Sequence, residues 1–141
     1  MRQIILIISI SSFFLILSSC VNESDKIIGK WERTDDEFSG MVIEVKRHGN
    51  ELRGEIIQNC THPYCNRWII GDVKWKNIKY IEENEFEFES LSKIASDNGI
   101  ITETSYNLYK LELFGDSILK TQAYSKGSEF IGTKQSFRKI P

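Results

Sequence analysis

Apolar and polar residues alternate with a period of two along most of this 141-residue chain after residue 26. The clearest case is 85–89, Glu-Phe-Glu-Phe-Glu, where the aromatic side chains fall on one face and the carboxylates on the other. Such alternation predicts β-strands that bury one face. The same pattern, bounded by glycine and asparagine, predicts further strands at 41–48, 51–58, 67–73, 75–82, 106–114, 117–124 and 128–139.

The links between these strands are short, and this favours one architecture. Gly49-Asn50 and Gly115-Asp116 are two-residue links of the hairpin type, and only 91–99 is expected to hold a turn of helix. About eight consecutive antiparallel strands suit an up-and-down barrel, which closes on itself and leaves no exposed edge. A flat sheet would leave an apolar face uncovered, and a sandwich is the alternative. The predicted fold class is therefore all-β, a small antiparallel barrel.

The first 19 residues follow a different pattern. Arg2 precedes an apolar run over 4–17 that only serines interrupt. A charged start and an apolar middle are features of an export signal, and the run is shorter than the roughly 20 residues that cross a bilayer. Leu17-Ser18-Ser19-Cys20 resembles a lipobox, the acylation motif of bacterial lipoproteins. We therefore expect a signal-peptide helix at 1–19, a lipidated cysteine and polar tether at 20–26, and a barrel domain at 27–141.

The lipobox resemblance implies a location. Several acyl chains on Cys20 would attach the protein stably to a membrane surface, because two or more chains are needed for stable anchoring. Val21 stands where an aspartate would signal retention at the inner membrane in the resembled class. The resemblance therefore implies the cell envelope of a Gram-negative bacterium, on the outer membrane.

Charge excludes one class of partner. The chain has 18 Lys+Arg against 20 Asp+Glu, a formal net charge of −2. Nucleic-acid binding calls for a basic patch or stripe, and the sequence offers none. We expect no nucleic-acid partner.

The start of the barrel domain carries a second resemblance. Ile28-Gly29-Lys30-Trp31 resembles the Gly-x-Trp entry motif of lipocalins and of bacterial lipocalin-like domains. The resemblance implies that Trp31 closes one barrel end and that an arginine of the last strand, Arg138, packs across it. It also implies that the barrel binds a small apolar or amphipathic ligand. Candidate ligand-binding residues are Trp68, Trp75, Phe86, Phe88, Tyr106 and Tyr109.

The loop 59–65, Asn-Cys-Thr-His-Pro-Tyr-Cys, is the most chemically distinctive stretch. With Cys20 acylated, Cys60 and Cys65 remain as a pair in an exported protein, where thiols tend to oxidise, so a disulfide is expected. The alternative is a soft-metal site in which Cys60, His62 and Cys65 bind copper(I) or zinc. If the loop is stiffened by a disulfide, it suits recognition of an envelope or extracellular protein, as in inhibitor-type lipoproteins.

Motifs of catalysis are missing from the sequence. It contains no Gly-x-Ser-x-Gly elbow, no phosphate-binding glycine loop and no His-Glu-x-x-His pair. Glu85, Glu87 and Glu89 share one strand face, and a solvated outer face explains them. We therefore expect a binding protein rather than an enzyme, with no catalytic residue and no cofactor.

Overall fold

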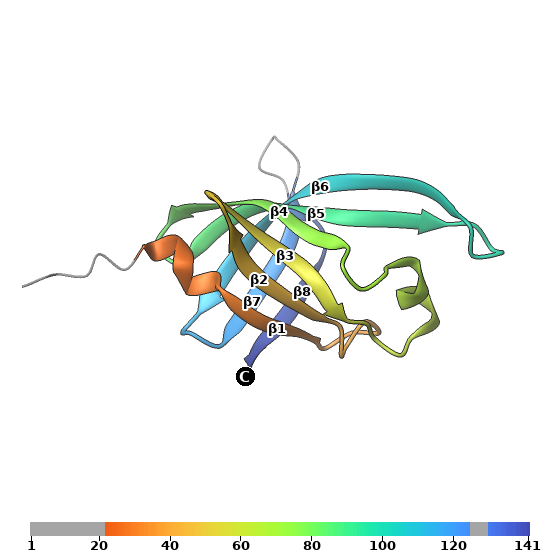
Figure 1. Ribbon diagram of the computed structural model, residues 1–141, viewed down its shortest axis with the longest axis horizontal. Helices are drawn as coiled ribbons and strands as arrows, with labels where there is room; N and C mark the ends of the chain where they lie inside the picture. The colour runs from red at the N-terminus through yellow and green to blue at the C-terminus, as the bar shows by residue number, and fades with distance from the viewer. Residues whose placement is uncertain (1–21, 125–129) are drawn as a thin grey trace, which may run out of the picture.

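Eight antiparallel strands close into a barrel in the computed structural model, which describes residues 22–124 and 130–141 (Figure 1). Each strand pairs with its neighbours in chain order, and the last strand pairs with the first. The strands are β1 (Gly29–Thr34), β2 (Val42–His48), β3 (Glu51–Gln58), β4 (Val73–Glu82), β5 (Glu85–Ala95), β6 (Ile101–Phe114), β7 (Ile118–Tyr124) and β8 (Phe130–Ile140). Two short 3-10 helices complete the fold: η1 (Glu23–Ile27) precedes β1, and η2 (Pro63–Arg67) lies in the link between β3 and β4. The predicted all-β up-and-down barrel is confirmed, and it is consistent with a lipocalin-like fold.

Large aromatic side chains fill the barrel interior. Trp31, Trp75, Phe86, Phe88 and Phe137 are each at most 1 % exposed. The ring of Trp75 lies 5.2 Å from that of Phe88 and 5.0 Å from that of Phe137 between centroids. Each such burial contributes roughly 1.5–3 kcal/mol. The alternation that predicted the strands therefore also identifies the core.

The segment before β1 is part of the folded domain. Asn22 caps η1 by accepting a hydrogen bond from the Ser24 amide. The Trp31 indole donates to the Ile27 carbonyl over 2.8 Å, and Arg47 pairs with Asp25. The predicted polar tether over 20–26 is folded from Asn22 onward, because these bonds and the burial of Ile27 hold the segment on the barrel.

The predicted contact between Arg138 and Trp31 is also wrong. The register pairs Trp31 with Lys139 and Glu32 with Arg138, and successive side chains point to opposite faces of a strand. Arg138 therefore lies on the outer face, where its guanidinium is 2.6 Å from the Glu32 carboxylate. The Lys139 ammonium lies 5.3 Å from the centroid of the Trp31 ring instead. Gly29 leaves room for this lysine, since a Cβ there would lie 2.8 Å from Lys139 Cε.

Two expected elements differ from the structure. Residues 67–73 were expected to form a strand, but the chain turns there and β4 begins only at Val73, because Gly71 has a φ of +96°. The helical turn expected over 91–99 is absent as well. Residues up to Ala95 continue β5 because they pair with β6, and only the tip after them turns.

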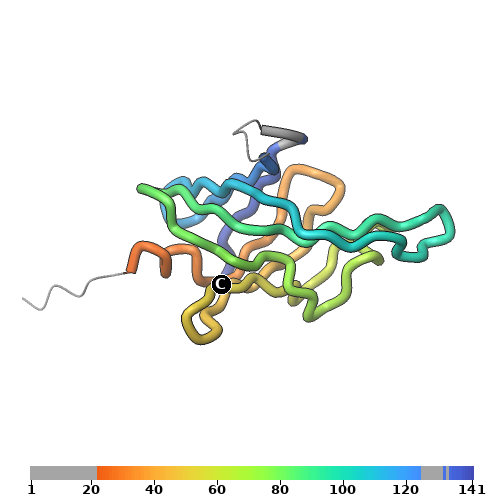
Figure 2. Tube along the Cα trace, turned by 90° about the horizontal axis from the view of Figure 1, so that it is seen from above, coloured from red at the N-terminus to blue at the C-terminus, as the bar shows by residue number. Residues whose placement is uncertain are grey.

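The barrel has two different ends (Figures 1 and 2). We call the end with η1 and the β2–β3, β4–β5 and β6–β7 turns the closed end. The opposite end, here called the loop end, carries the link 35–41, the link 59–72 and the β5–β6 hairpin, which extends past the barrel. Asn22, the first described residue, lies at the closed end. The predicted signal peptide at 1–19 and the lipidation site Cys20 lie outside the described residues.

No helix within 22–124 or 130–141 is long and apolar enough to cross a membrane.

Candidate functional site at the loop end

A disulfide joins Cys60 to Cys65 in the link between β3 and β4, as predicted. The sequence sets up this closure locally. Pro63 begins η2, and His62 caps it by accepting a hydrogen bond from the Tyr64 amide over 3.2 Å. Both thiols are consumed by the bond, so a soft metal could use them only after reduction. Among the described residues, no group of three or more His, Cys, Asp or Glu side chains could hold a metal ion.

Asn59 fixes the disulfide loop to the chain that follows it. Its amide nitrogen donates to the carbonyls of Cys65 and Trp68, each over 2.8 Å. Its amide oxygen accepts from the Cys60 backbone over 3.2 Å. One side chain thus satisfies backbone groups on both sides of η2. The link is held in a defined shape by this amide and by the disulfide together.

Aromatic rings and cations pack beneath this loop. The Phe38 ring, from the β1–β2 link, meets the buried Trp68 edge-on with 5.6 Å between centroids. The Arg33 guanidinium lies 4.6 Å from the Phe38 ring, and the Lys74 ammonium lies 4.6 Å from the Trp68 ring. The cation–π contact of the Arg33 guanidinium is worth about 2 kcal/mol when desolvated, and that of Lys74 contributes only while its amine is charged. The layer connects β1, the disulfide loop and β4.

The two buried cations of this layer are held differently. The guanidinium of Arg33 donates a hydrogen bond to the Asp36 carboxylate over 2.6 Å and forms an ion pair with it. Lys74 donates to the Leu91 carbonyl and forms no ion pair with any described residue. The pKa of Lys74 is lowered to about 7, chiefly by burial and also by the nearby charges of Arg33 and Lys93, whereas Asp72 partly opposes the shift. Near neutral pH this amine is therefore neutral in a large fraction of molecules.

An open cleft of about 540 Å³ lies between η2 and the tip of the β5–β6 hairpin. The Arg67 guanidinium donates to the Lys93 carbonyl over 3.1 Å, and the Lys93 ammonium lies 2.5 Å from Asp72. These contacts hold the hairpin against the β3–β4 link. The cleft is lined by Pro63, Tyr64, Asn66 and Arg67 on one side and by Ala95, Ser96, Asp97 and Gly99 on the other. Its volume falls in the range of about 300–1,000 Å³ that is usual for ligand pockets.

Large apolar side chains at the loop end are exposed to solvent. They belong to η2, to the turn before β4 and to the tip of the hairpin, and their exposed fractions run from 38 % to 67 %. The residues are Tyr64, Ile69, Ile70, Ile94, Ile100 and Ile101. Exposed apolar surface of this kind often marks a protein interaction site when it is gathered in one region.

The structure separates the predicted ligand-binding residues. Trp75 and Phe88 pack on each other inside the barrel, and Phe86 is buried there against the partly exposed ring of Tyr80. Trp68 lies beneath the disulfide loop instead. Tyr106 and Tyr109 are partly buried beside the core. The Tyr106 hydroxyl donates to the Val73 carbonyl over 2.9 Å, and the Tyr109 ring lies 5.5 Å from the Phe88 ring. None of these six residues lines the cleft between η2 and the hairpin.

Lys74, Arg67 and the exposed isoleucines are candidates that the sequence pattern alone does not reveal. Lys74 lies between Val73 and Trp75, where a lysine ordinarily points to solvent, and nothing in the local pattern shows its burial. Ile69 and Ile70 fall within the strand predicted over 67–73, so the pattern did not indicate that they are exposed. The pair of isoleucines at 100 and 101, directly after a turn, was the signal that could have been used.

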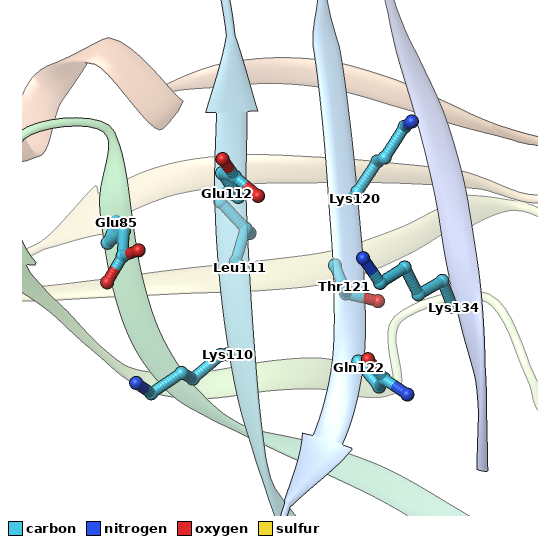
Figure 3. A pocket seen from close by; sticks show the side chains of 8 residues that line it. All are labelled: Glu85, Lys110, Leu111, Glu112, Lys120, Thr121, Gln122 and Lys134. Atoms are coloured by element: carbon cyan, nitrogen blue, oxygen red, sulfur yellow. The ribbon is translucent and has the colours of Figure 1, made fainter. Parts of the chain in front are cut away.

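A second hollow, of about 240 Å³, lies over the strands β5 to β8 (Figure 3). Its charged side chains come from adjacent strands, and Glu112 stands opposite Lys120 in the register. The side chains drawn there are Glu85, Lys110, Leu111, Glu112, Lys120, Thr121, Gln122 and Lys134. Because both signs of charge alternate and the volume is small, this hollow is the weaker candidate for a site.

No protein-family model, no curated protein and no solved structure matches this chain. The fold assignment therefore rests on the barrel itself.

Proposed function

We propose that this protein is a membrane-anchored recognition module of the cell envelope that binds a protein partner through its loop end. The observation that carries the proposal is the set of exposed apolar side chains at that end. The disulfide and the Asn59 amide hold the β3–β4 link in place, and the contacts of Arg67 and Lys93 hold the β5–β6 hairpin beside it. A preformed surface loses little conformational entropy on binding, so more of the contact energy appears as affinity.

The barrel supports a role for its surface more than for its interior. The interior is occupied by Trp31, Trp75, Phe86, Phe88 and Phe137, so a ligand there would have to displace fully buried rings. Exposed isoleucines and Tyr64, in contrast, can enter pockets of a partner without rearrangement of the barrel. Burying one such side chain is worth roughly 1.5–3 kcal/mol.

The anchor at Cys20 completes the proposal. The lipobox-like segment 17–20 and the apolar run before it support export of the protein and acylation of Cys20. An exported, acylated protein would be attached to a membrane, here the outer membrane of a Gram-negative bacterium. Replacement of Cys20 by alanine should release the protein from membranes. Membrane association that persists in this variant would refute the anchor.

Photo-crosslinking in the host cell tests the recognition surface. A photoreactive phenylalanine analogue at Ile70 or at Ile100 should give one adduct of constant mass. The same group at Lys46, an exposed position on the outer face of β2, is the matched control and should give none. Adducts of equal yield at all three positions, or none at Ile70 and Ile100, would contradict the proposal.

A small amphipathic ligand is the second candidate, and the cleft of about 540 Å³ is the observation that favours it. Its lining offers the Tyr64 ring, the Arg67 guanidinium and the Asp97 carboxylate to one molecule. Native mass spectrometry of the protein purified from its host would show a retained organic mass. The Ala95→Trp variant, in which the new ring fills the cleft, should lose that mass. The Gln122→Trp variant, which changes the second hollow over β5 to β8, should retain it.

A further inference from the structure

We infer that the closed end of the barrel is a membrane-contact face that lies on the lipid surface next to the anchor. The inference rests on the proposed lipidation of Cys20. It adds an orientation to that anchor: the closed end meets the lipid, and the loop end points away from it. Four exposed apolar residues carry the contact, and we call them the closed-end rim: Tyr80, Ile81, Phe114 and Ile118.

The length of chain between the lipid and the fold is the first argument. Asn22 is already fixed as the cap of η1, and Cys20 precedes it by two residues. Two residues span at most about 7 Å when fully extended. An acylated Cys20 therefore cannot place the closed end far from the bilayer. A free tether over 20–26 would have allowed any orientation, but the folded η1 removes most of that freedom.

The attachment of η1 to the barrel is the second argument. The Trp31 indole donates to the Ile27 carbonyl, and Arg47 of β2 pairs with Asp25. The helix η1 also contacts β4. These contacts place η1 beside β4, and Figures 1 and 2 show it at the same end of the barrel as the β6–β7 turn. The point of attachment and the closed-end rim are therefore on the same end of the molecule.

The chemistry of the rim suits the interfacial layer of a membrane. Phe114 and Ile118 stand directly opposite each other across the β6–β7 hairpin, and the rim side chains are 37 % to 50 % exposed. The Lys120 ammonium lies 5.1 Å from the Phe114 ring, so an ammonium can reach lipid phosphates while the ring enters the apolar layer. Apolar side chains of surface-bound proteins enter about 5–10 Å into the boundary of headgroups and acyl chains.

Charge contributes little to this contact. Glu23 pairs with Lys26, and Asp116 in the β6–β7 turn adds a second carboxylate at this end, so the closed end is not a basic patch. The contact should therefore depend on apolar insertion and on the anchor. It should not require anionic lipid and should persist at high salt.

Quenching of tryptophan fluorescence by brominated lipid tests the orientation. The full-length lipidated protein, purified from its host, is placed in phosphatidylcholine vesicles with bromine on the acyl chains. Phe114→Trp and Ile118→Trp put an indole in the closed-end rim, and Ile70→Trp is the matched control at the loop end. All three sites are exposed, so the fold tolerates the new ring. The emission of the parent protein, from its buried tryptophans, is subtracted.

Quenching that is several-fold stronger for the two rim variants than for Ile70→Trp is the expected result. Equal quenching at both ends, or stronger quenching at Ile70→Trp, would overturn the inference. Flotation of the same vesicles separates the two proposals. Protein that does not float, and whose mass shows no acyl chains, refutes the anchor. Protein that floats without quenching of the rim variants refutes the membrane-contact face alone.

Discussion

The buried amine of Lys74 makes the folding stability of this protein dependent on pH. Its pKa falls from the ordinary value of 10.5 to about 7 in the folded state, because burial disfavours the charged form. The charged and titratable groups that face it are Arg33 of β1, Asp72 of the link before β4 and Lys93 of β5. The perturbation we propose is Lys74→Met, which removes the amine and keeps an unbranched apolar chain of similar length.

The direction of the pH dependence of stability follows from proton binding to Lys74. Between the two pKa values the unfolded chain holds a proton on Lys74 that the folded protein lacks, so the free energy of unfolding rises with pH. The slope approaches about 1.4 kcal/mol per pH unit, and the gain between pH 7 and 9.5 is about 3 kcal/mol. The variant lacks this contribution, and at pH 7 it should be more stable than the parent by a similar order.

Urea denaturation followed by tryptophan fluorescence, at pH values from 6.5 to 9.5, measures this effect. The upper limit of this pH range avoids the ionisation of Tyr124, whose pKa is raised to about 12 by burial and by its hydrogen bond to Glu87. The difference in unfolding free energy between parent and variant should shrink as the pH rises. A difference that is the same at every pH would refute the account of a desolvated Lys74.

Three further predictions concern the scaffold. Trp31→Ala should lower the free energy of unfolding by about 3–5 kcal/mol in the same denaturation assay, because it empties a fully buried site; a loss below about 1 kcal/mol would contradict the assigned burial. Cys60→Ser combined with Cys65→Ser should cost about 2 kcal/mol, because the bridge closes a short loop. Unchanged stability after complete reduction of the parent would speak against that contribution. Gly29→Val should lower the melting temperature, since a side chain there meets Lys139 Cε and Gly29 has a φ of +138°; an unchanged melting temperature would disprove the close approach.

The sequence predicted the architecture well because alternation and turn residues act locally. Strands and hairpins are specified within a few residues, as the alternation over 85–89 and the turn at Gly49 illustrate. Eight such strands have few ways to bury their apolar faces together. The disulfide was predictable for a similar reason, since only Cys60 and Cys65 remain once Cys20 is assigned to the lipid.

The candidate site was harder to predict from the sequence because it depends on contacts between different segments of the chain. The burial of Lys74 depends on Leu91 of β5, whose carbonyl accepts its hydrogen bond from 17 residues along the chain, and on the Trp68 ring of the link before β4. The place of Arg138 depended on the register between β1 and β8, and a shift of one residue exchanges the inner and outer faces. The position of η1 rests on the hydrogen bond from Trp31, the ion pair between Asp25 and Arg47 and the burial of Ile27, and no periodic pattern reveals these contacts.

The affinity of the crosslinked partner for the mature protein tests the central claim most directly. With the partner purified, the combined variant Ile69→Ser and Ile70→Ser should raise the dissociation constant at least about tenfold, since the full burial of even one isoleucine is worth roughly 1.5–3 kcal/mol and 1.4 kcal/mol corresponds to tenfold. Lys46→Ser, on the outer face of β2, should leave it unchanged. An equal dissociation constant for all three proteins would contradict recognition through the loop end.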